Sequence, residues 1–234
     1  IGLFRSDNGG DDWDFKFAPT ADNVALDPAD PERLYLFGQS HQAYQPLWRS
    51  DDGGDAWTPL TITFPAVDMS DCMDHLKPYP ITGTLYVGSA CGLMRSPDQG
   101  ENWEPAMGNL TDKAVTDLAF HPTDPQTMYL GTVNGNIFIS HDGGDSWTFA
   151  SQPVGRVHEL DVNPFGAHEV WVAAESFYGD PPGAFKSTNA DLTAWESIAP
   201  PGGVNPIDDF FTFAPRTWGA AYANTVYAAS GYTT

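Results

Sequence analysis

Ser140-His141-Asp142-Gly143-Gly144-Asp145-Ser146-Trp147 is the stretch that decides the fold, because its pattern Ser-x-Asp-x-Gly-x-x-Trp recurs along the chain. Residues 50–57 and 96–103 have the same spacing, and residues 6–13 match it with Asn in the Asp position. A fifth copy, residues 187–195, is degenerate: Asn189 replaces Asp, the Gly is missing and one residue is inserted. We call these five stretches the boxes. Their recurring positions are Ser6, Asn8, Gly10, Trp13, Ser50, Asp52, Gly54, Trp57, Ser96, Asp98, Gly100, Trp103, Ser140, Asp142, Gly144, Trp147, Ser187 and Trp195.

The spacing of the boxes indicates the architecture. Their serines lie 44, 46, 44 and 47 residues apart, and a period in the forties with short apolar strands is typical of a β-propeller with one four-stranded antiparallel blade per repeat. In the third repeat, residues 118–122 read as a first strand ending at a proline, residues 128–131 as a second and residues 137–140 as a third that runs into the box. We therefore predict an all-β fold, five visible blades, and each box as the turn between third and fourth strands.

The residue types in a box suit such a turn. Gly permits the positive φ that a tight turn needs, the Asp or Asn side chain can accept backbone N–H bonds within the turn, and the Trp ring can bury a large area between strands. With these residues in these places, the chain resembles the Asp-box (BNR) repeat propellers, which include sialidases, sortilin-type receptors and xyloglucanases. The resemblance covers nearly the whole chain. It implies the propeller fold but no single activity, since the box serves unrelated functions in that family.

The two ends of the chain carry complementary parts of a blade. Residues 3–6 read as a third strand, whereas residues 211–215 and 224–229 read as a first and a second strand. We expect a single propeller domain, 1–234, in which the strand pair 1–17 completes the blade begun by 209–230 and closes a five-blade ring without sheet edges. The alternative is an arc of a larger propeller.

Composition limits the function classes. Lys and Arg total 10 and Asp and Glu 31, so the formal charge is 10 − 31 = −21, which excludes attraction to nucleic acid or anionic lipid as the main activity. No apolar run approaches the roughly 20 residues of a membrane span, so we expect no direct membrane insertion. Few lysines, with 8 Trp, 23 Gly and 20 Pro, suit a loop-rich protein that is secreted, periplasmic or on the cell surface. Cys72 and Cys91 flank neighbouring first and second strands, and we predict a disulfide between them.

Candidate binding residues lie opposite the boxes. There the first strands begin and the loops between second and third strands open, and we call this the loop-bearing end of each blade. Its longer loops span residues 38–46, 64–73, 175–183 and 200–209. Every expected first-strand start carries a carboxylate, and these starts are Asp22–Asn23, Asp74–His75, Thr116–Asp117, His158–Glu159 and Asp208–Asp209. This predicts an acidic ring that binds a cation, a basic peptide or sugar hydroxyls; the alternative is that strand starts simply favour Asp in an acidic chain. The predicted binding residues are His41, Tyr44, Asp74, His75, Asp117, His158, Glu159, Phe177, Tyr178, Asp208 and Asp209.

Three functions remain open. The first is a non-catalytic extracytoplasmic scaffold, alone or as a subunit of a larger assembly, that binds a protein partner or a glycan at the loop-bearing end. The second is a glycoside hydrolase that uses a carboxylate pair such as Asp117 and Glu159, and the third is a lectin. Sialidase activity is disfavoured, because a sialidase needs a cluster of arginines for the substrate carboxylate. Three of the arginines here, Arg5, Arg49 and Arg95, precede box serines and so lie at the end of the blade opposite the candidate binding residues. We expect no cofactor and no zinc. Calcium in the central opening of the propeller or between blades is an alternative.

Overall fold

The structure is a computed structural model, and it describes residues 2–17, 23–37, 47–62, 77–81, 83–152, 155–166, 169–174, 183–187, 189–198, 210–213 and 226–229. The chain divides into two compact units, Ile1–Pro105 and Ala106–Thr234. All the regular secondary structure in the described residues is β-strand, so the prediction of an all-β chain is confirmed.

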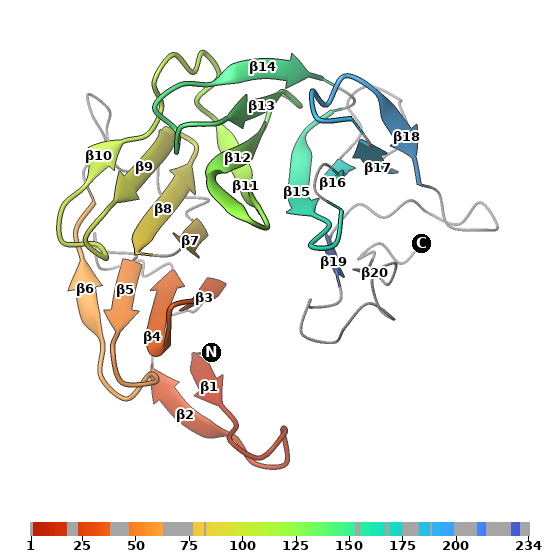
Figure 1. Cartoon of the computed structure of the whole chain (residues 1–234). Helices are drawn as coiled ribbons and strands as arrows, with labels where there is room; N and C mark the ends of the chain where they lie inside the picture. Colours follow the sequence, from red (N-terminus) through yellow and green to blue (C-terminus); the bar gives the residue numbers. More distant parts are fainter. Residues whose placement is uncertain are drawn as a thin grey trace. The chain divides into compact units, whose positions relative to one another are not determined.

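The first unit contains three antiparallel sheets (Figure 1). Two of them have four strands each, and the third is a two-stranded sheet at the start of the chain. In chain order the strands are β1 (Leu3–Arg5) and β2 (Asp14–Phe17); β3 (Asn23–Asp27), β4 (Asp30–Phe37), β5 (Leu47–Ser50) and β6 (Thr58–Leu60); and β7 (Lys77–Ile81), β8 (Thr84–Ser89), β9 (Gly92–Ser96) and β10 (Glu104–Pro105).

The second unit repeats this plan with two four-stranded sheets and a two-stranded sheet near its end (Figure 1). Its strands are β11 (Val115–His121), β12 (Asp124–Thr132), β13 (Ile137–Ser140) and β14 (Thr148–Ser151); β15 (Val157–Val162), β16 (Val170–Ala174), β17 (Gly183–Ser187) and β18 (Trp195–Ser197); and β19 (Phe210–Phe213) and β20 (Val226–Ala229). The four-stranded antiparallel blade predicted from the repeat is therefore confirmed, and in each four-stranded sheet the box lies between the third and the fourth strand; the first box joins β1 to β2.

The register of first and second strands repeats from blade to blade. Each second strand has an aromatic residue at the same position: Tyr35 opposite Ala25, Tyr86 opposite Tyr79, Tyr129 opposite Ala119, Trp171 opposite Asp161 and Tyr227 opposite Thr212. This shared register aligns the blades residue by residue.

Apolar side chains of consecutive blades form a core within each unit. In the first unit Tyr35 and Leu47 pack in one cluster with Leu85 and Met94 of the next blade. Burying an apolar side chain of this size is worth about 1.5–3 kcal/mol, so packing between blades supplies much of what an isolated blade lacks. The second unit has an equivalent cluster that joins Tyr129 and Ile137 of one blade to Val157, Val172 and others of the next.

First strands of successive blades lie side by side within a unit. β3 lies beside β7, β11 lies beside β15, and β15 lies beside β19, while fourth strands end their sheets. This is the packing of propeller blades around a centre. The joining of residues 1–17 to the blade begun by 209–230 concerns how the two units meet, and it stays a prediction.

Candidate functional site

Each box is held together by hydrogen bonds among its own residues. Ser140 Oγ donates to Asp142 Oδ1 at 2.8 Å and accepts the Gly144 N–H at 2.9 Å. Asp142 Oδ1 also accepts the Ser146 N–H at 2.8 Å. The boxes that begin at residues 6, 50 and 96 repeat these three bonds. The recurring polar side chains are therefore bonded inside the turn, where they satisfy its backbone N–H groups.

Two boxes have a residue other than glycine in the left-handed region of φ. Gln99 has a φ of 65°, close to the 69° and 68° of Gly53 and Gly143 at the same box position. In the degenerate fifth box Leu192 takes a φ of 51° and is fully buried. Left-handed backbone is unfavourable for residues with a Cβ, so both positions carry strain that the surrounding box must hold in place.

The box tryptophans also donate hydrogen bonds within the fold. Trp57 Nε1 donates to the Gly54 carbonyl at 2.9 Å, and the tryptophans at positions 13 and 103 do the same in their boxes. Trp147 differs, because its Nε1 donates to the Ala106 carbonyl at 2.9 Å, outside its own box. In the fifth box Trp195 Nε1 donates to the Leu192 carbonyl at 2.9 Å.

The donors of the boxes depress the pKa values of their carboxyl groups. Hydrogen bonds from Asn102, first from its side chain and then from its backbone, together with the Ser96 hydroxyl hold the pKa of Asp98 at about 2. The pKa of Asp142 is lowered chiefly by the Ser146 hydroxyl and N–H, and that of Asp52 chiefly by a backbone N–H. These carboxylates are stabilised as acceptors inside the turns, and this is a structural role.

Arginines that directly precede the first two boxes reach into the box of the following blade. Arg5 Nη1 donates to the Gly53 carbonyl at 2.7 Å, and Arg49 Nη1 donates to the Gln99 carbonyl at 2.9 Å. Because Gly53 and Gln99 hold the same box position, the two links are equivalent. These arginines lie at the box end, as expected from sequence, and their repeated position directly before a box serine was the signal for this shared role.

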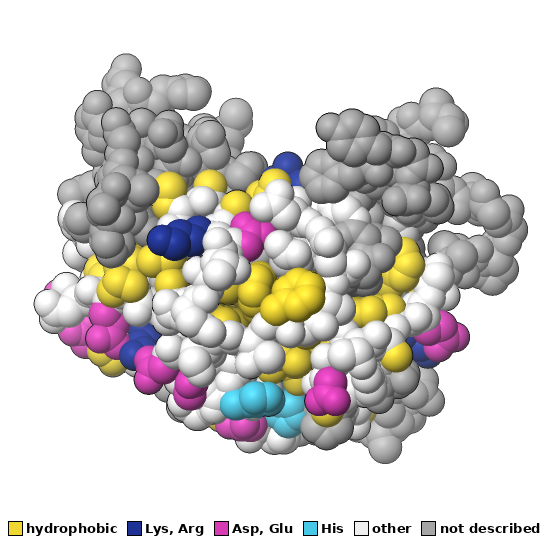
Figure 2. Space-filling model, turned by 90° about the horizontal axis from the view of Figure 1, so that it is seen from above, with side chains coloured by type: hydrophobic (Ala, Val, Ile, Leu, Met, Phe, Trp, Pro, Cys, Tyr) yellow, Lys and Arg dark blue, Asp and Glu magenta, His cyan; other side chains and the backbone are white. Residues whose placement is uncertain are grey.

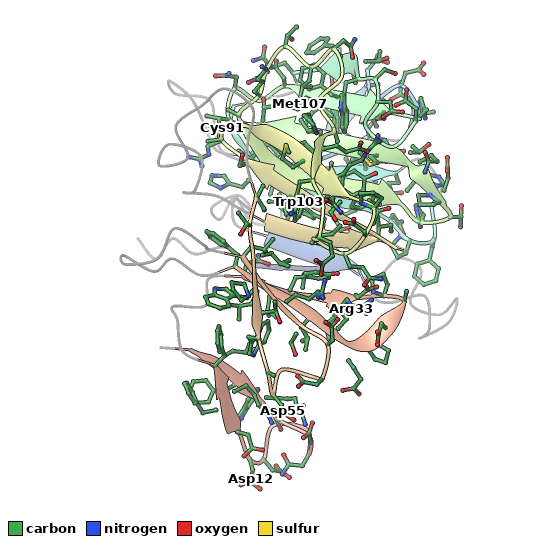
Figure 3. The ribbon with its side chains drawn as sticks, turned by 90° about the vertical axis from the view of Figure 1, so that its left-hand side faces the viewer. Asp12, Arg33, Asp55, Cys91, Trp103 and Met107 are labelled. Carbon is green, nitrogen blue, oxygen red and sulfur yellow. The ribbon has the colours of Figure 1, made fainter. Side chains whose placement is uncertain are left out.

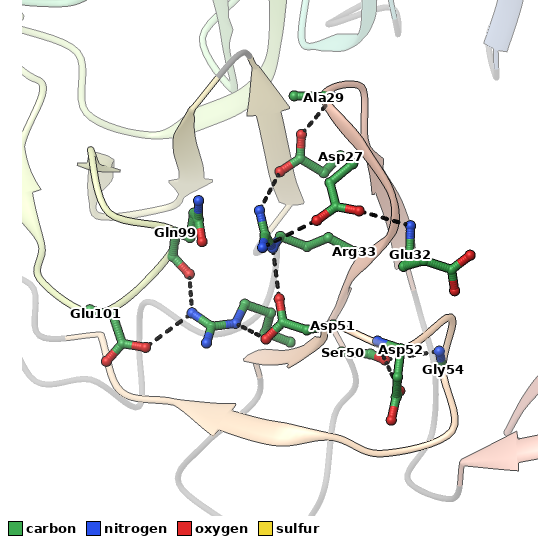
Figure 4. A network of polar contacts seen from close by, with 12 residues as sticks. Asp27, Ala29, Glu32, Arg33, Ser50, Asp51, Asp52, Gly54, Gln99 and Glu101 are labelled. Atoms are coloured by element: carbon green, nitrogen blue, oxygen red, sulfur yellow. Dashed lines mark hydrogen bonds and ion pairs between the residues drawn. The ribbon is translucent and has the colours of Figure 1, made fainter.

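An ion-pair network surrounds the second of these links (Figure 4). Asp51 bridges two arginines: its Oδ1 lies 2.7 Å from Arg33 Nε and its Oδ2 3.0 Å from Arg49 Nε. Arg49 Nη1 also lies 3.1 Å from Glu101 Oε1. Burial acts to raise the pKa of Asp51, but the hydrogen bonds and charges of the two arginines outweigh it and lower that pKa. Figure 2 likewise shows acidic side chains beside Lys and Arg on one face.

At the loop-bearing end of the β11–β14 blade, Asp112 organises the loop between β12 and β13. Its Oδ2 accepts hydrogen bonds from Thr132 Oγ1 at 2.7 Å, Asn134 Nδ2 at 3.1 Å and Asn136 Nδ2 at 2.7 Å. Burial acts to raise the pKa of Asp112, and these donors together outweigh it and lower the pKa. The sequence analysis missed this residue, because its partners come from a different strand pair 20 to 24 residues away.

Asp117 and Glu159, the predicted carboxylate pair, occupy the same register position in successive blades. Asp117 lies opposite Gly131 and Glu159 opposite Ala173, each just after an irregularity in its first strand. Asp117 is 4% exposed, and its Oδ2 accepts the backbone N–H of Leu160 at 2.7 Å. This bond joins β11 to β15. His158 and Glu159 are half-buried at the start of β15.

The register identifies the residues that hold the position of Asp117 in the other blades. In β7, the first strand of the second blade, Lys77 lies opposite Gly88 at that position. The equivalent position in the first blade is Asn23, opposite Phe37. The remaining predicted binding residues lie outside the described residues: His41, Tyr44, Asp74, His75, Phe177, Tyr178, Asp208 and Asp209.

Cys91 lies in the turn between β8 and β9 and packs, with Trp103, against the core of the first unit (Figure 3). Cys72 is outside the described residues, so the predicted disulfide stays a prediction. Among the side chains that the structure describes, no group of three or more His, Cys, Asp or Glu is placed to hold a metal ion. Nor do the described residues contain a helix long and apolar enough to cross a membrane.

Comparison with known proteins supports this architecture. Residues 91–198 match the Sortilin-Vps10 family profile (sortilin, neurotensin receptor 3). The crystal structure of a GH74 enzyme from Niastella koreensis superposes with a TM-score of 0.68 at 22% identity, over 88% of this chain and 35% of that one. The chain is a BNR-like β-propeller protein. YCF48 bound to D1 peptide also shares the fold of this propeller, with a TM-score of 0.63 at 15% identity, over 98% of this chain and 70% of that one.

Curated relatives of the propeller have two different roles. An oligoxyloglucan-reducing end-specific xyloglucanase of Emericella nidulans is 28% identical over 215 residues, which cover 76% of this chain and 26% of the enzyme. The photosystem II stability/assembly factor HCF136, chloroplastic, of Arabidopsis thaliana is 26% identical over 160 residues, 65% of this chain and 38% of that protein. The chain thus spans roughly a quarter to two fifths of these relatives' length.

Proposed function

We propose that this propeller is a non-catalytic scaffold that binds a protein partner at its loop-bearing end. The observation that carries the proposal is the use of its recurring charged groups: the box carboxylates accept bonds inside their turns, and Asp117, the first catalytic candidate, is buried against the Leu160 N–H. The residues that differ most between blades lie in the loops at the loop-bearing end, and propellers commonly bind their ligands through such loops.

The relatives support a protein partner without identifying it. One is named as an assembly factor, and one structure that shares the fold holds a peptide. From the composition we infer a place outside the cytoplasm: secreted, periplasmic or at the cell surface. A disulfide between Cys72 and Cys91 would agree with an oxidising compartment.

Site-specific photocrosslinking tests the proposal. A photoreactive amino acid replaces Thr111, which is exposed at the loop-bearing end of the β11–β14 blade, or Gln126, which is exposed at the box end of the same blade. After irradiation in extract of the source cells, we expect a discrete protein adduct at position 111 and none at position 126. Equal labelling at both positions, or none at 111, would overturn the proposal.

A second candidate is a glycoside hydrolase, which the xyloglucanase relatives favour. Such an enzyme needs two carboxyl groups about 5–10 Å apart across the sugar, and Glu159 is the better exposed member of the predicted pair. Incubation with xyloglucan oligosaccharides and measurement of new reducing ends decides between the two candidates. Turnover that Glu159→Gln abolishes would establish the hydrolase and remove the scaffold proposal; binding of oligosaccharide without turnover would favour the lectin.

A further inference from the structure

Two cations of the described chain lack the carboxylate partner that the others have. Eight Lys and Arg side chains are described, and six of them form ion pairs: Arg5, Lys16, Arg33, Arg49, Arg95 and Lys186. Among the described residues, Lys113 and Arg156 form none. In a chain with a formal charge of −21, carboxylates are abundant, so a cation without one is unusual.

Both of these cations lie at the loop-bearing end of adjacent strands. Lys113 comes two residues before β11, and Arg156 immediately precedes β15. β11 and β15 lie side by side, joined by the bond from the Leu160 N–H to Asp117. Gly131 shows which residues of the two strands lie close together. It pairs with Asp117 of β11, and a Cβ added to it would lie 2.5 Å from Val157 Cγ1 of β15.

Unsatisfied hydrogen-bonding groups occur at the same level. Arg156 Nε is buried and has no hydrogen-bond partner, and the same is true of Thr116 Oγ1. Thr116 is only 9% exposed. Thr116 precedes Asp117 and Arg156 precedes Val157, and both Asp117 and Val157 lie next to Gly131. Buried donors in native proteins almost always have a partner, and leaving one unsatisfied costs about 1–3 kcal/mol.

From this arrangement we propose that the loop-bearing ends of β11 and β15 bind a carboxylate group of a peptide partner, through Arg156 and Thr116 with Lys113 at the margin. A guanidinium presents donors in a planar fork that matches a carboxylate, and the Thr hydroxyl can donate beside it. Asp112, Asp117 and Glu159 lie nearby; Asp112 already accepts three side-chain donors, and Asp117 accepts the Leu160 N–H.

A peptide fits this end better than an acidic sugar. Carbohydrate sites commonly place a Phe, Tyr or Trp ring against the sugar face, and the described residues at this end, 111–116, 132–137 and 155–159, include none of these three. They offer instead Thr, Asn, Lys and Arg side chains suited to polar and charged peptide groups. The inference rests on the proposed scaffold function, because it names the chemistry that the partner would present there.

NMR titration with a defined probe tests the site. The probe is acetyl-trialanine with a free C-terminal carboxylate, its control is the same peptide as the C-terminal amide, and the readouts are the Arg156 Nε–H and the Thr116 amide. We expect saturable shifts with the acid and at least tenfold weaker binding of the amide. Arg156→Gln should weaken the acid about tenfold or more, whereas Lys186→Gln, which removes a distant positive charge, should not.

Several outcomes would overturn the site. They are equal shifts for the acid and amide peptides, unchanged affinity in Arg156→Gln, or tighter binding of a glucuronate oligosaccharide than of the peptide. Thermal melting checks that each variant is folded, and Arg156→Lys, which keeps the charge but loses the fork, should bind with intermediate affinity. A protein adduct at position 111 alongside failed carboxylate binding would refute this site alone, whereas xyloglucan turnover would refute the scaffold function.

Discussion

Replacing Asp117 separates a structural carboxylate from a catalytic one. Its Oδ2 accepts the Leu160 N–H at 2.7 Å, and both residues are 4% exposed. Asp117→Ala leaves that N–H buried without an acceptor, which costs about 1–3 kcal/mol. For a chain of this size each 1 kcal/mol lowers Tm by roughly 2–4 °C, so we expect a fall of about 2–12 °C.

The conservative change Asp117→Asn sharpens the test. The amide oxygen can still accept the Leu160 N–H, so we expect at most about half of the Asp117→Ala loss, measured by thermal and chemical denaturation. Asp191→Ala is the matched control, because Asp191 is exposed in the fifth box and surface changes of this kind stay within about 0.5 kcal/mol. An unchanged Tm in Asp117→Ala would refute the structural role. Loss of sugar turnover in Asp117→Asn at unchanged stability would make the residue catalytic.

Three further changes test the boxes and the cysteines. Gln99→Gly should raise stability by about 0.5–1 kcal/mol in denaturant titration, since Gln99 has the φ of Gly53 and relief of left-handed strain exceeds the added chain entropy of Gly; a lower midpoint would contradict this. Because the pKa of Asp98 is depressed to about 2, its stabilisation is present above about pH 4 and is lost as pH falls toward about 2. Asp98→Asn, which copies Asn8 of the first box, should flatten Tm against pH in that window, and an unchanged profile would refute the assignment. Non-reducing peptide mapping should recover a Cys72–Cys91 crosslinked peptide, and two alkylated thiols would exclude the disulfide.

The blades were predictable from sequence because their determinants are local. Ser140, Asp142 and Gly144 interact within five residues of one another, so the spacing of the residues already contains the geometry of the turn. The strands around the boxes were equally clear, since their apolar residues form continuous runs. The degenerate fifth box was recognisable because it retains Ser187, Asn189 and Trp195. In the structure Ser187 still donates its hydrogen bond to Asn189, at 2.8 Å.

The first strand of the second blade is hard to align from sequence for a physical reason. β7 contains Pro78 and Pro80, which argue against a strand in a sequence, because proline cannot donate to a ladder. β7 is the edge strand of its sheet, where only one neighbour needs ladder bonds. By register Lys77 holds the position that Asp117 holds in the next blade, while Asp74 and His75 lie outside the described residues.

Contacts between blades were hidden for another reason. Asp112 and Asp117 find their partners only after the strands assemble, and Asp117 bonds to a backbone N–H that no residue type marks. The unsatisfied Thr116 Oγ1 and Arg156 Nε could be recognised only once burial was known. The sequence therefore predicted that the binding residues lie at the loop-bearing end. The side chains that are buried there without a hydrogen-bond partner could be identified only from the folded structure.

The arginine links between boxes have a consequence for how such chains grow. Arg5 and Arg49 each bind a main-chain carbonyl of the following box, and every amino acid supplies that atom. This hydrogen bond therefore places no demand on the side chain at that box position, which is Gly53 in one box and Gln99 in the next. Mutation is then free to diversify the remainder of the blade, and a lineage can change its repertoire of ligands while the junctions between modules stay interchangeable.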